Sequence, residues 1–355
     1  MPLPQDLPSS HPEKMKAWLY TTASPTLEND LHLDTNARTP PAPKGSEVLV
    51  QVLTAALNPA DYKVPELGLP SRLLIARPAS PGLDFCGRVI STGPLAQHLA
   101  EGTLVYGCPP KPVQFGSLGE YVCVDATGVA VLPEGVKIDI AAGLGVAGQT
   151  AYQSLEGRVS AGSKVFINGG SGGCGTLGIQ IAKAMGCHVT VTCSTKNIEL
   201  CFRLGADDVI DYTVEKDLIS RLTQKGVFDC VVDHIGIPSN LYYESHRFLK
   251  EGGEYVQVGS ASMLASVTKA LWPTFLGGGQ RKYVLIKQQN VPKHLAQLGE
   301  WVADGTIQMQ VDSVFEYSDV VQAYEKLRLK RTRGKILVHV NDPNALNLEG
   351  FGIGF

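Results

Sequence analysis

A glycine-rich loop between a predicted strand and a predicted helix constrains this chain more than any other feature. Residues 164–168 read Lys-Val-Phe-Ile-Asn, an apolar stretch that predicts a buried strand, and residues 176–185 predict a helix. Between them glycines recur in the spacing G-x-G-x-x-G, which lets a backbone approach a pyrophosphate at a helix N-terminus. We therefore expect a dinucleotide-binding loop, rather than a turn without a ligand, formed by Gly170, Ser171, Gly172, Gly173, Cys174 and Gly175.

The stretch around this loop alternates between strands and helices. Near-continuous apolar strands with helices between them are typical of a parallel sheet covered on both faces. We expect an α/β chain in which residues 141–289 form a doubly wound, Rossmann-type NADP-binding domain. Besides the elements at the loop, the pattern predicts a helix at 198–204 and strands at 188–193, 208–211, 228–233, 254–259 and 283–287.

The remainder of the chain is expected to form a second domain. Short strands bounded by Gly or Pro predict a compact β-domain, with a partly closed barrel as one arrangement. These strands are predicted at 47–52, 87–90, 104–106 and 120–124, and helices at 295–302 and 320–328 with a strand at 335–340 are expected to return to them. The expected domain therefore spans 15–140 and 290–340, and flexible tails are expected at 1–14 and 341–355.

The composition excludes several classes of function. The 355 residues carry a formal charge of −3, which gives no broad basic surface for nucleic acid. No apolar run reaches the length of about 18 residues that predicts a membrane span, and residues 1–14 lack the apolar core of a secretory signal. The eight cysteines include no C-x-x-C pair, so we interpret them as free thiols of a cytoplasmic protein.

The loop after the second Rossmann-type strand indicates which dinucleotide would bind. A site that prefers NAD places Asp or Glu at the end of this strand, and here residues 192–197 contain no acid. Ser194 and Lys196 instead suit a 2′-phosphate, through a hydroxyl and a cation, and Tyr212 could close the adenosine side. The prediction is NADPH, and the alternative for Lys196 is a solvated lysine at a helix start.

Several motifs in unbroken order, from about residue 15 to residue 340, resemble those of one family. The chain is similar to zinc-free medium-chain dehydrogenases/reductases, which include quinone oxidoreductases and enoyl reductases, and among them to fungal trans-acting enoyl reductases of secondary metabolism. The resemblance implies a GroES-like catalytic domain, a Rossmann cofactor domain and an active site in the cleft between them. It rests on the glycine loop and on residues 57–63, 81–85, 147–152, 204–212 and 333–336.

The same resemblance implies that no metal is bound. Zinc alcohol dehydrogenases of this superfamily use a cysteine, a Gly-His-Glu motif and a four-cysteine lobe. Here the first two positions match Asn58 and Gly82-Leu83-Asp84, and the lobe region holds one cysteine, Cys108. Zinc needs three or four ligands at fixed geometry, which this set does not supply. The implied reaction is hydride transfer from NADPH to an activated C=C bond or to a quinone, with donors for the enolate and a proton for the α-carbon.

In such reductases the stretch from Asn58 to Lys63 lies beside the nicotinamide. We carry over Asn58 and Lys63 as catalytic residues on that basis, and Tyr62 is a third candidate donor to the enolate. Each residue also has a structural interpretation. Asn58 before Pro59 suits a turn, Tyr62 suits the core and Lys63 suits a solvated surface.

The resemblance implies further cofactor contacts at the ends of strands and at the helix that links the domains. We expect Thr150 at this helix, and the other contacts at Ile235, Gly236, Val258, Gly259, Leu285 and Lys335. Next to them, His234 is interpreted as a histidine satisfied by a neighbour rather than as a general acid. Residues 263–283, with aromatics beside a glycine run, suit a substrate lid or a subunit contact.

The expected substrate is a small, apolar α,β-unsaturated carbonyl compound, and the expected assembly is a monomer or a homodimer. One alternative is a trans-acting enoyl reductase whose polyketide substrate is tethered to the carrier protein of a synthase. Another is an NADPH-binding protein without catalytic turnover. For the last alternative, we expect NADPH to bind and protect the protein, but no oxidation of NADPH that depends on a substrate.

Overall fold

The computed structural model describes residues 12–258, 269, 272 and 276–341. The chain divides into two compact units. The first unit comprises residues 1–149, 290–305 and 311–355, and the second comprises residues 150–289 and 306–310.

The two units differ from the expected domains at two places. Residues 141–149 belong to the first unit, whereas the sequence pattern assigned them to the second. Residues 306–310 belong to the second unit, where the Gln180 side chain pairs with the backbone of Gln308. The Gln180 amide donates to the Gln308 carbonyl at 2.9 Å and accepts from the Gln308 N–H at 2.7 Å. The expected tails lie mostly outside the described residues.

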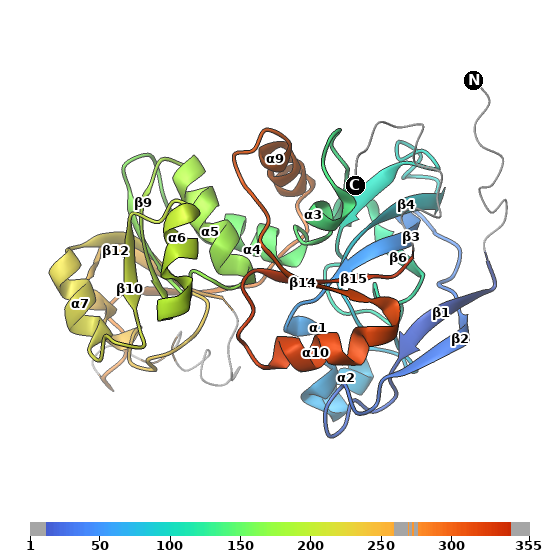
Figure 1. Ribbon diagram of the computed structural model, residues 1–355, viewed down its shortest axis with the longest axis horizontal. Helices are drawn as coiled ribbons and strands as arrows, with labels where there is room; N and C mark the ends of the chain where they lie inside the picture. Colours follow the sequence, from blue (N-terminus) through green and yellow to red (C-terminus); the bar gives the residue numbers. More distant parts are fainter. Residues whose placement is uncertain (1–11, 259–268, 270–271, 273–275, 342–355) are drawn as a thin grey trace. The chain divides into compact units, whose positions relative to one another are not determined.

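Six parallel strands form the sheet of the second unit (Figure 1). They are β8 (Lys164–Asn168), β9 (His188–Cys193), β10 (Asp208–Asp211), β11 (Phe228–Asp233), β12 (Leu249–Val258) and β13 (Lys282–Ile286). Their order, β10-β9-β8-β11-β12-β13, is the order of dinucleotide-binding Rossmann folds. The expectation of a doubly wound parallel sheet is confirmed, and the strands from β8 to β11 have the predicted bounds.

Helices cover this sheet because its central strands, β8 and β11, are buried nearly throughout their length. Phe166 in β8 lies at the centre of the core, with its ring 5.8 Å from Phe228 and 6.5 Å from Phe248 between centroids. The helices of this part of the chain are α4 (Val146–Leu155), α5 (Gly173–Ala184), α6 (Ile198–Arg203) and α7 (Leu218–Lys225).

The first unit contains a seven-stranded sheet in the order β14-β15-β3-β4-β5-β7, with β6 paired to β3. On one side of β3, the first half pairs with β6 and the last residues pair with β15. The predicted return of the C-terminal strand is therefore confirmed. The strands are β3 (Glu47–Ala56), β4 (Asp84–Thr92), β5 (Leu104–Gly107), β6 (Tyr121–Asp125), β7 (Val129–Val131), β14 (Val311–Glu316) and β15 (Lys335–His339).

A separate hairpin and several helices complete the described part of the first unit. The hairpin joins β1 (Lys14–Leu19) to β2 (His32–Arg38). The helices are α1 (Ala60–Lys63), α2 (Leu69–Leu74), α3 (Ile138–Ala142), α9 (Pro292–Ala303) and α10 (Val320–Arg328). Short α1 follows β3 directly, and it carries the residues from which a catalytic role was expected.

Candidate functional site

The glycine loop of the second unit leaves open space at a helix N-terminus. A Cβ on Gly170 would lie 2.9 Å from the Val191 side chain, and one on Gly175 would lie 2.0 Å from the Gly169 carbonyl oxygen. These two glycines therefore allow close packing within the protein. A Cβ on Gly172 would meet nothing within 4 Å. Helix α5 begins at the next residue with no side-chain cap, so its N-terminus and this open space fit an approaching pyrophosphate.

The loop after β9 is tied to the glycine loop by a residue that the sequence analysis missed. The Asn197 amide donates to the Ser171 hydroxyl at 3.0 Å and to the Ser194 hydroxyl at 3.2 Å. Asn197 is itself buried, whereas Lys196 is exposed. The Tyr212 N–H donates to the carbonyl of Cys193 at 3.1 Å, which holds Tyr212 beside the same strand end. The three residues expected around the 2′-phosphate side, Ser194, Lys196 and Tyr212, are thus on neighbouring segments.

Other predicted cofactor residues follow the carboxyl ends of the strands. Ile235 is exposed, and Gly236 has a φ of +78°, a conformation that favours glycine. Val258 ends β12, and Leu285 on β13 is half-exposed. Thr150 is buried in α4, where its carbonyl accepts from the Ser154 hydroxyl at 2.7 Å. Gly259 lies outside the described residues.

His234 corrects one expectation. Both ring nitrogens are buried, and neither has a hydrogen-bond partner within the described part of the chain, so the histidine is not satisfied by a neighbour. Burial lowers the pKa of His234 to about 4. The imidazole is therefore neutral at pH 7 and poorly suited to act as a general acid. Residues 263–283 were expected to form a substrate lid or a subunit contact, and about half of them lie outside the described residues.

The first unit contains a buried cation that orients Asn58. Lys335 begins β15 and is 3% exposed. Its Nζ donates to Asp84 Oδ2 at 2.9 Å, to Asn58 Oδ1 at 2.7 Å and to the Leu57 carbonyl at 3.0 Å. An ammonium has three N–H groups, so Lys335 has none left for a cofactor phosphate. Lys335 was expected to contact the cofactor. In this geometry its ammonium instead binds the Asn58 side chain and holds it in place.

Two buried carboxyl groups surround this cation. Asp84 Oδ1 accepts from the Val146 N–H at 2.7 Å, and burial raises the pKa of Asp84 despite the attraction of Lys335. Asp61 Oδ2 accepts from the Asn58 N–H at 2.7 Å, which fixes the turn before α1. Burial raises the pKa of Asp61 to about 8, so this carboxyl holds a proton at pH 7.

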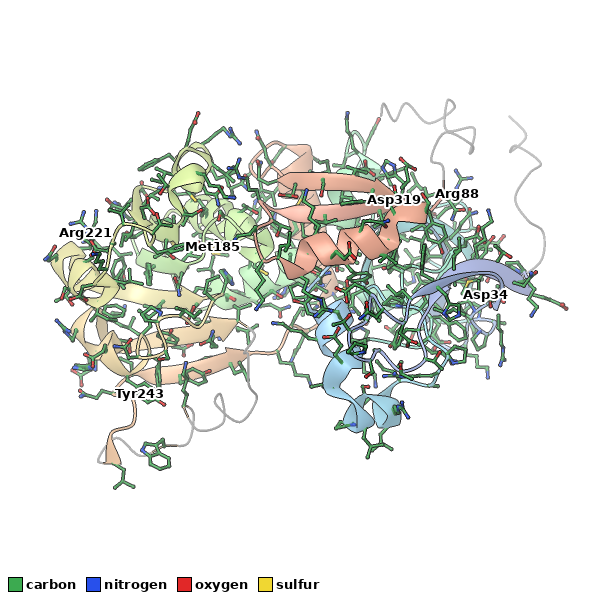
Figure 2. All side chains as sticks on the ribbon, turned by 60° about the horizontal axis from the view of Figure 1, so that its bottom comes forward. Asp34, Arg88, Met185, Arg221, Tyr243 and Asp319 are labelled. Atoms are coloured by element: carbon green, nitrogen blue, oxygen red, sulfur yellow. The ribbon has the colours of Figure 1, made fainter. Side chains whose placement is uncertain are left out.

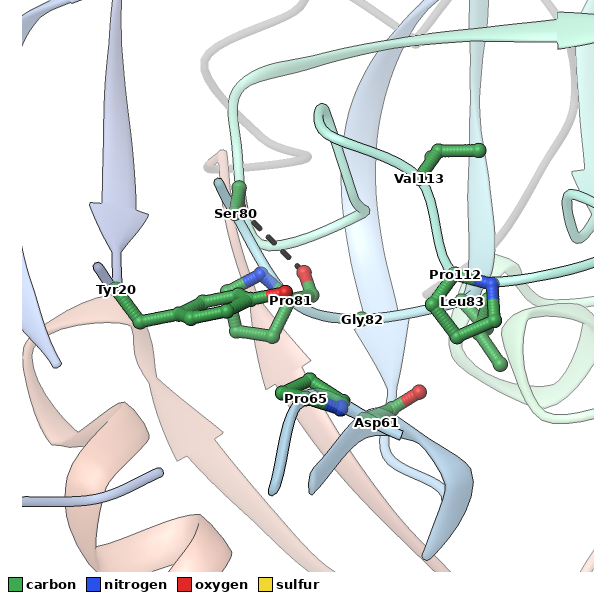
Figure 3. Close-up of a pocket in the computed structure, with 9 residues that line it drawn as sticks. All are labelled: Tyr20, Asp61, Pro65, Ser80, Pro81, Gly82, Leu83, Pro112 and Val113. Carbon is green, nitrogen blue, oxygen red and sulfur yellow. Dashed lines mark hydrogen bonds between the residues drawn. The ribbon is translucent and has the colours of Figure 1, made fainter. Parts of the chain in front are cut away.

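The second oxygen of Asp61 has no partner within the described residues. Asp61 lines a small pocket of the first unit, across from the segment 81–83 (Figure 3). A neutral carboxyl avoids the large free-energy cost of an unpaired buried charge, which explains how this oxygen is tolerated. The full lining consists of Tyr20, Asp61, Pro65, Ser80, Pro81, Gly82, Leu83, Pro112 and Val113.

The other two catalytic candidates have different surroundings. Tyr62 is 4% exposed within the core of the first unit, and the Arg328 guanidinium lies 4.2 Å from its ring centroid. This placement fits the structural interpretation of Tyr62. Lys63 is exposed at the end of α1, and partial burial together with nearby Lys330 lowers the pKa of its ammonium. Of the two, Lys63 is the side chain that a ligand can reach.

The residues at the positions of zinc ligands do not fit zinc. Asn58 and Asp84 are hydrogen-bonded to Lys335, and Leu83 has no ligating atom. The Cys108 thiol is buried and donates to Asn290 Oδ1 at 3.4 Å. Across the described residues, no group of three His, Cys, Asp or Glu side chains is placed to hold a metal ion. No helix in that part of the chain is long and apolar enough to span a membrane.

Comparisons with known proteins agree with both units. Residues 44–134 match the alcohol dehydrogenase GroES-like domain, and residues 204–338 match the zinc-binding dehydrogenase family. A trans-enoyl reductase of Aspergillus terreus is 43% identical over 94% of this chain and 98% of its own. An NADPH-dependent alkenal/one oxidoreductase of Arabidopsis thaliana, chloroplastic, is 33% identical over 93% of this chain and 81% of its own. The structure of a Coxiella burnetii quinone oxidoreductase matches with a TM-score of 0.80 at 29% identity, covering 92% of this chain and all of the other.

Proposed function

Because this chain belongs to the medium-chain dehydrogenase/reductase family of oxidoreductases, which use a nicotinamide cofactor, we propose that it reduces the C=C bond of α,β-unsaturated carbonyl compounds, or a quinone, with NADPH. The observation that carries the proposal is the orientation of Asn58 by buried Lys335. By the resemblance, Asn58 matches a position where zinc alcohol dehydrogenases have a metal ligand, and the hydrogen bond from Lys335 keeps its amide fixed. The relatives named above reduce activated double bonds or quinones by name, and they support the same reaction.

The residues of the first unit would act on the charge that develops in the reaction. A bound reduced nicotinamide supplies the hydride, and the substrate oxygen then gains negative charge. One N–H of the Asn58 amide donates to the Ala56 carbonyl at 3.3 Å, and the second has no partner within the described residues. Because Lys335 holds the amide oxygen, the orientation of the amide is fixed, and a fixed donor is what stabilising an oxyanion would require. Lys63 would donate to the same oxygen or deliver a proton.

The choice of NADPH rests on Ser194 and Lys196, and Lys196→Ala tests it. Loss of a charged hydrogen bond to a 2′-phosphate, worth about 1.5–3 kcal/mol, should weaken NADPH binding more than tenfold. NADH lacks this phosphate, so its dissociation constant should change less than about twofold. Titration of both cofactors measures the effect, and exposed Lys216→Ala in the same unit is the matched control. Equal losses for NADPH and NADH would rule out the 2′-phosphate contact.

A second candidate, action on a carrier-tethered substrate, is favoured by an exposed apolar surface around α2. Four leucines within eight residues are between 54% and 83% exposed, and Figure 2 shows side chains of this light-blue segment projecting outward. Lys63 and Arg72 are exposed beside them, which suits an acidic carrier protein. The leucines are Leu67, Leu69, Leu73 and Leu74.

The reaction is tested by following the loss of NADPH absorbance in the presence of a metal chelator. The acceptors are enals, enones, enoyl thioesters and quinones, each with NADH as the control, and one enoyl thioester is supplied both free and attached to a carrier protein. Turnover of free acceptors that survives the chelator supports the main proposal. Turnover of the carrier-bound thioester alone supports the second candidate. Tight NADPH binding without any turnover contradicts both and indicates a non-catalytic role.

A further inference from the structure

The strand order of the second unit reverses between β8 and β11. Loops that follow such neighbouring strands are where open parallel sheets bind their ligands. Asn168 ends β8, Asp233 ends β11, and the two residues are register partners. Both are buried, and the Asn168 amide donates to Asp233 Oδ1 at 2.8 Å. Two polar side chains therefore meet directly at the point of reversal.

Asp233 also holds the loop that follows its own strand. The backbone N–H groups of Ile235 and Gly236 donate to Asp233 Oδ1 at 2.9 and 2.8 Å. The Tyr255 hydroxyl of β12 donates to Asp233 Oδ2 at 2.5 Å. A buried carboxylate is tolerated when several donors satisfy it, and here four donors do so. The same donors fix the backbone of Ile235 and Gly236.

On the other side, the hydrogen bonds continue to the glycine loop. The Thr192 hydroxyl of β9 donates to Asn168 Oδ1 at 2.6 Å and accepts from the Gly169 N–H at 2.9 Å. The Gly170 N–H donates to the Thr192 carbonyl at 2.8 Å. One connected set of hydrogen bonds therefore spans the carboxyl-terminal halves of β9, β8, β11 and β12, which are adjacent in the sheet.

We propose that Asp233 is a positioning residue for the dinucleotide. It sets the Ile235–Gly236 backbone directly, and it sets the start of the glycine loop through Asn168 and Thr192. Both loops are then held in one arrangement before the cofactor binds, which reduces the ordering cost of binding. The inference rests on the proposed function for the identity of the ligand, and it adds a residue that touches neither the phosphate nor the reacting atoms.

Asp233→Asn tests this role. The amide keeps the size of the carboxyl group, but it replaces one accepting oxygen with an NH2 group that cannot accept. At least one donor therefore loses its acceptor, and the two loops lose their common anchor. We expect the dissociation constants of NADPH and NADH to rise together, by about tenfold, while kcat at saturating cofactor changes less than about twofold.

The matched control is Asp229→Asn, at the opposite end of the same strand. Asp229 pairs with Lys250 at 2.7 Å and accepts from the Lys164 N–H at 2.7 Å, so its loss also weakens contacts of the sheet. This variant should bind both cofactors like the parent protein. A lower thermal midpoint in both variants shows only that both carboxyl groups stabilise the sheet. A higher dissociation constant in Asp233→Asn but not in Asp229→Asn supports the positioning role of Asp233.

Tyr255→Phe keeps the inference testable if Asp233→Asn does not fold. It removes a single donor to Asp233 and should raise both dissociation constants by about threefold. Unchanged affinity in every variant that folds would overturn the inference. Because binding is measured without substrate, it separates this inference from the proposed reaction. If the parent protein turned over no acceptor, Asp233→Asn could still bind the cofactors more weakly. If the parent protein were active, Asp233→Asn could still bind them unchanged.

Discussion

Gly172→Val is expected to weaken NADPH binding at least about a hundredfold and to leave the protein folded. The Gly172 backbone has a φ of −83°, which any residue adopts, and a Cβ there meets no protein atom within 4 Å. The protein alone therefore accommodates the valine. Its branched side chain would occupy the space through which a pyrophosphate reaches the N-terminus of α5, and a loss of about 3 kcal/mol corresponds to the hundredfold change.

Gly175→Ala provides the contrast for this experiment. Its Cβ would lie 2.0 Å from the Gly169 carbonyl oxygen, so the backbone must shift and the protein should lose stability. Cofactor titration and thermal unfolding, measured on both variants, separate a blocked site from a damaged fold. Parent-like affinity in folded Gly172→Val would show that the loop does not contact the pyrophosphate.

Lys335→Met is expected to destabilise the protein by about 3 kcal/mol or more. The substitution keeps an unbranched side chain, one atom shorter, and removes the charge, so fully buried Asp84 loses its cation. Denaturant unfolding measures the change. The control is Lys326→Met, because Lys326 is 40% exposed and its ion pair with Asp312 should contribute less than about 1 kcal/mol. Similar losses in both variants would contradict the special role of the buried pair.

The pH dependence of Lys335→Met provides a further check. The folded-state pKa of Asp84 is already raised by burial, and removal of Lys335 raises it further. A carboxyl with a raised folded-state pKa stabilises the fold while it stays protonated, and this stabilisation is lost as pH rises through that pKa. The penalty of Lys335→Met should therefore be larger at pH 8 than at pH 5. A second substitution, Asp84→Leu, should restore part of the stability at high pH.

Local patterns predicted most of the second unit because its strands are continuous apolar runs. The hairpin strand β2 was not predicted, since His-Leu-Asp-Thr-Asn-Ala-Arg has no alternation of apolar residues and only Ala37 is buried. Strand β14 was also missed, because its residues are half-exposed along its length. Both strands form through their partners rather than through their own composition.

The site shows the same division between local and distant information. The glycine loop is contiguous, and it was predicted from its spacing together with the predicted strand before it and the predicted helix after it. Lys335 acts on Asn58, which is 277 positions away in the sequence, and Asp233 acts on Asn168, which is 65 positions away. No local pattern indicates such pairs. Asn197 could have been noticed as a polar residue at a helix start. Asp61 carries a comparable signal, because it follows Asn58 by three residues at the start of α1.

The placement of β15 affects how this protein can be synthesised. Strand β15 completes the pairing along β3, and its first residue supplies the cation for Asp84. Residues 12–149 leave the ribosome on the order of 10 s or more before Lys335, at the usual 5–20 residues per second. During that time the last residues of β3, Thr54–Ala56, lack their partner on one side, and Asp84 lacks its cation. A premature stop codon upstream of Lys335 would therefore leave the N-terminal half itself unstable, and chaperones or proteases would retain or degrade the fragment.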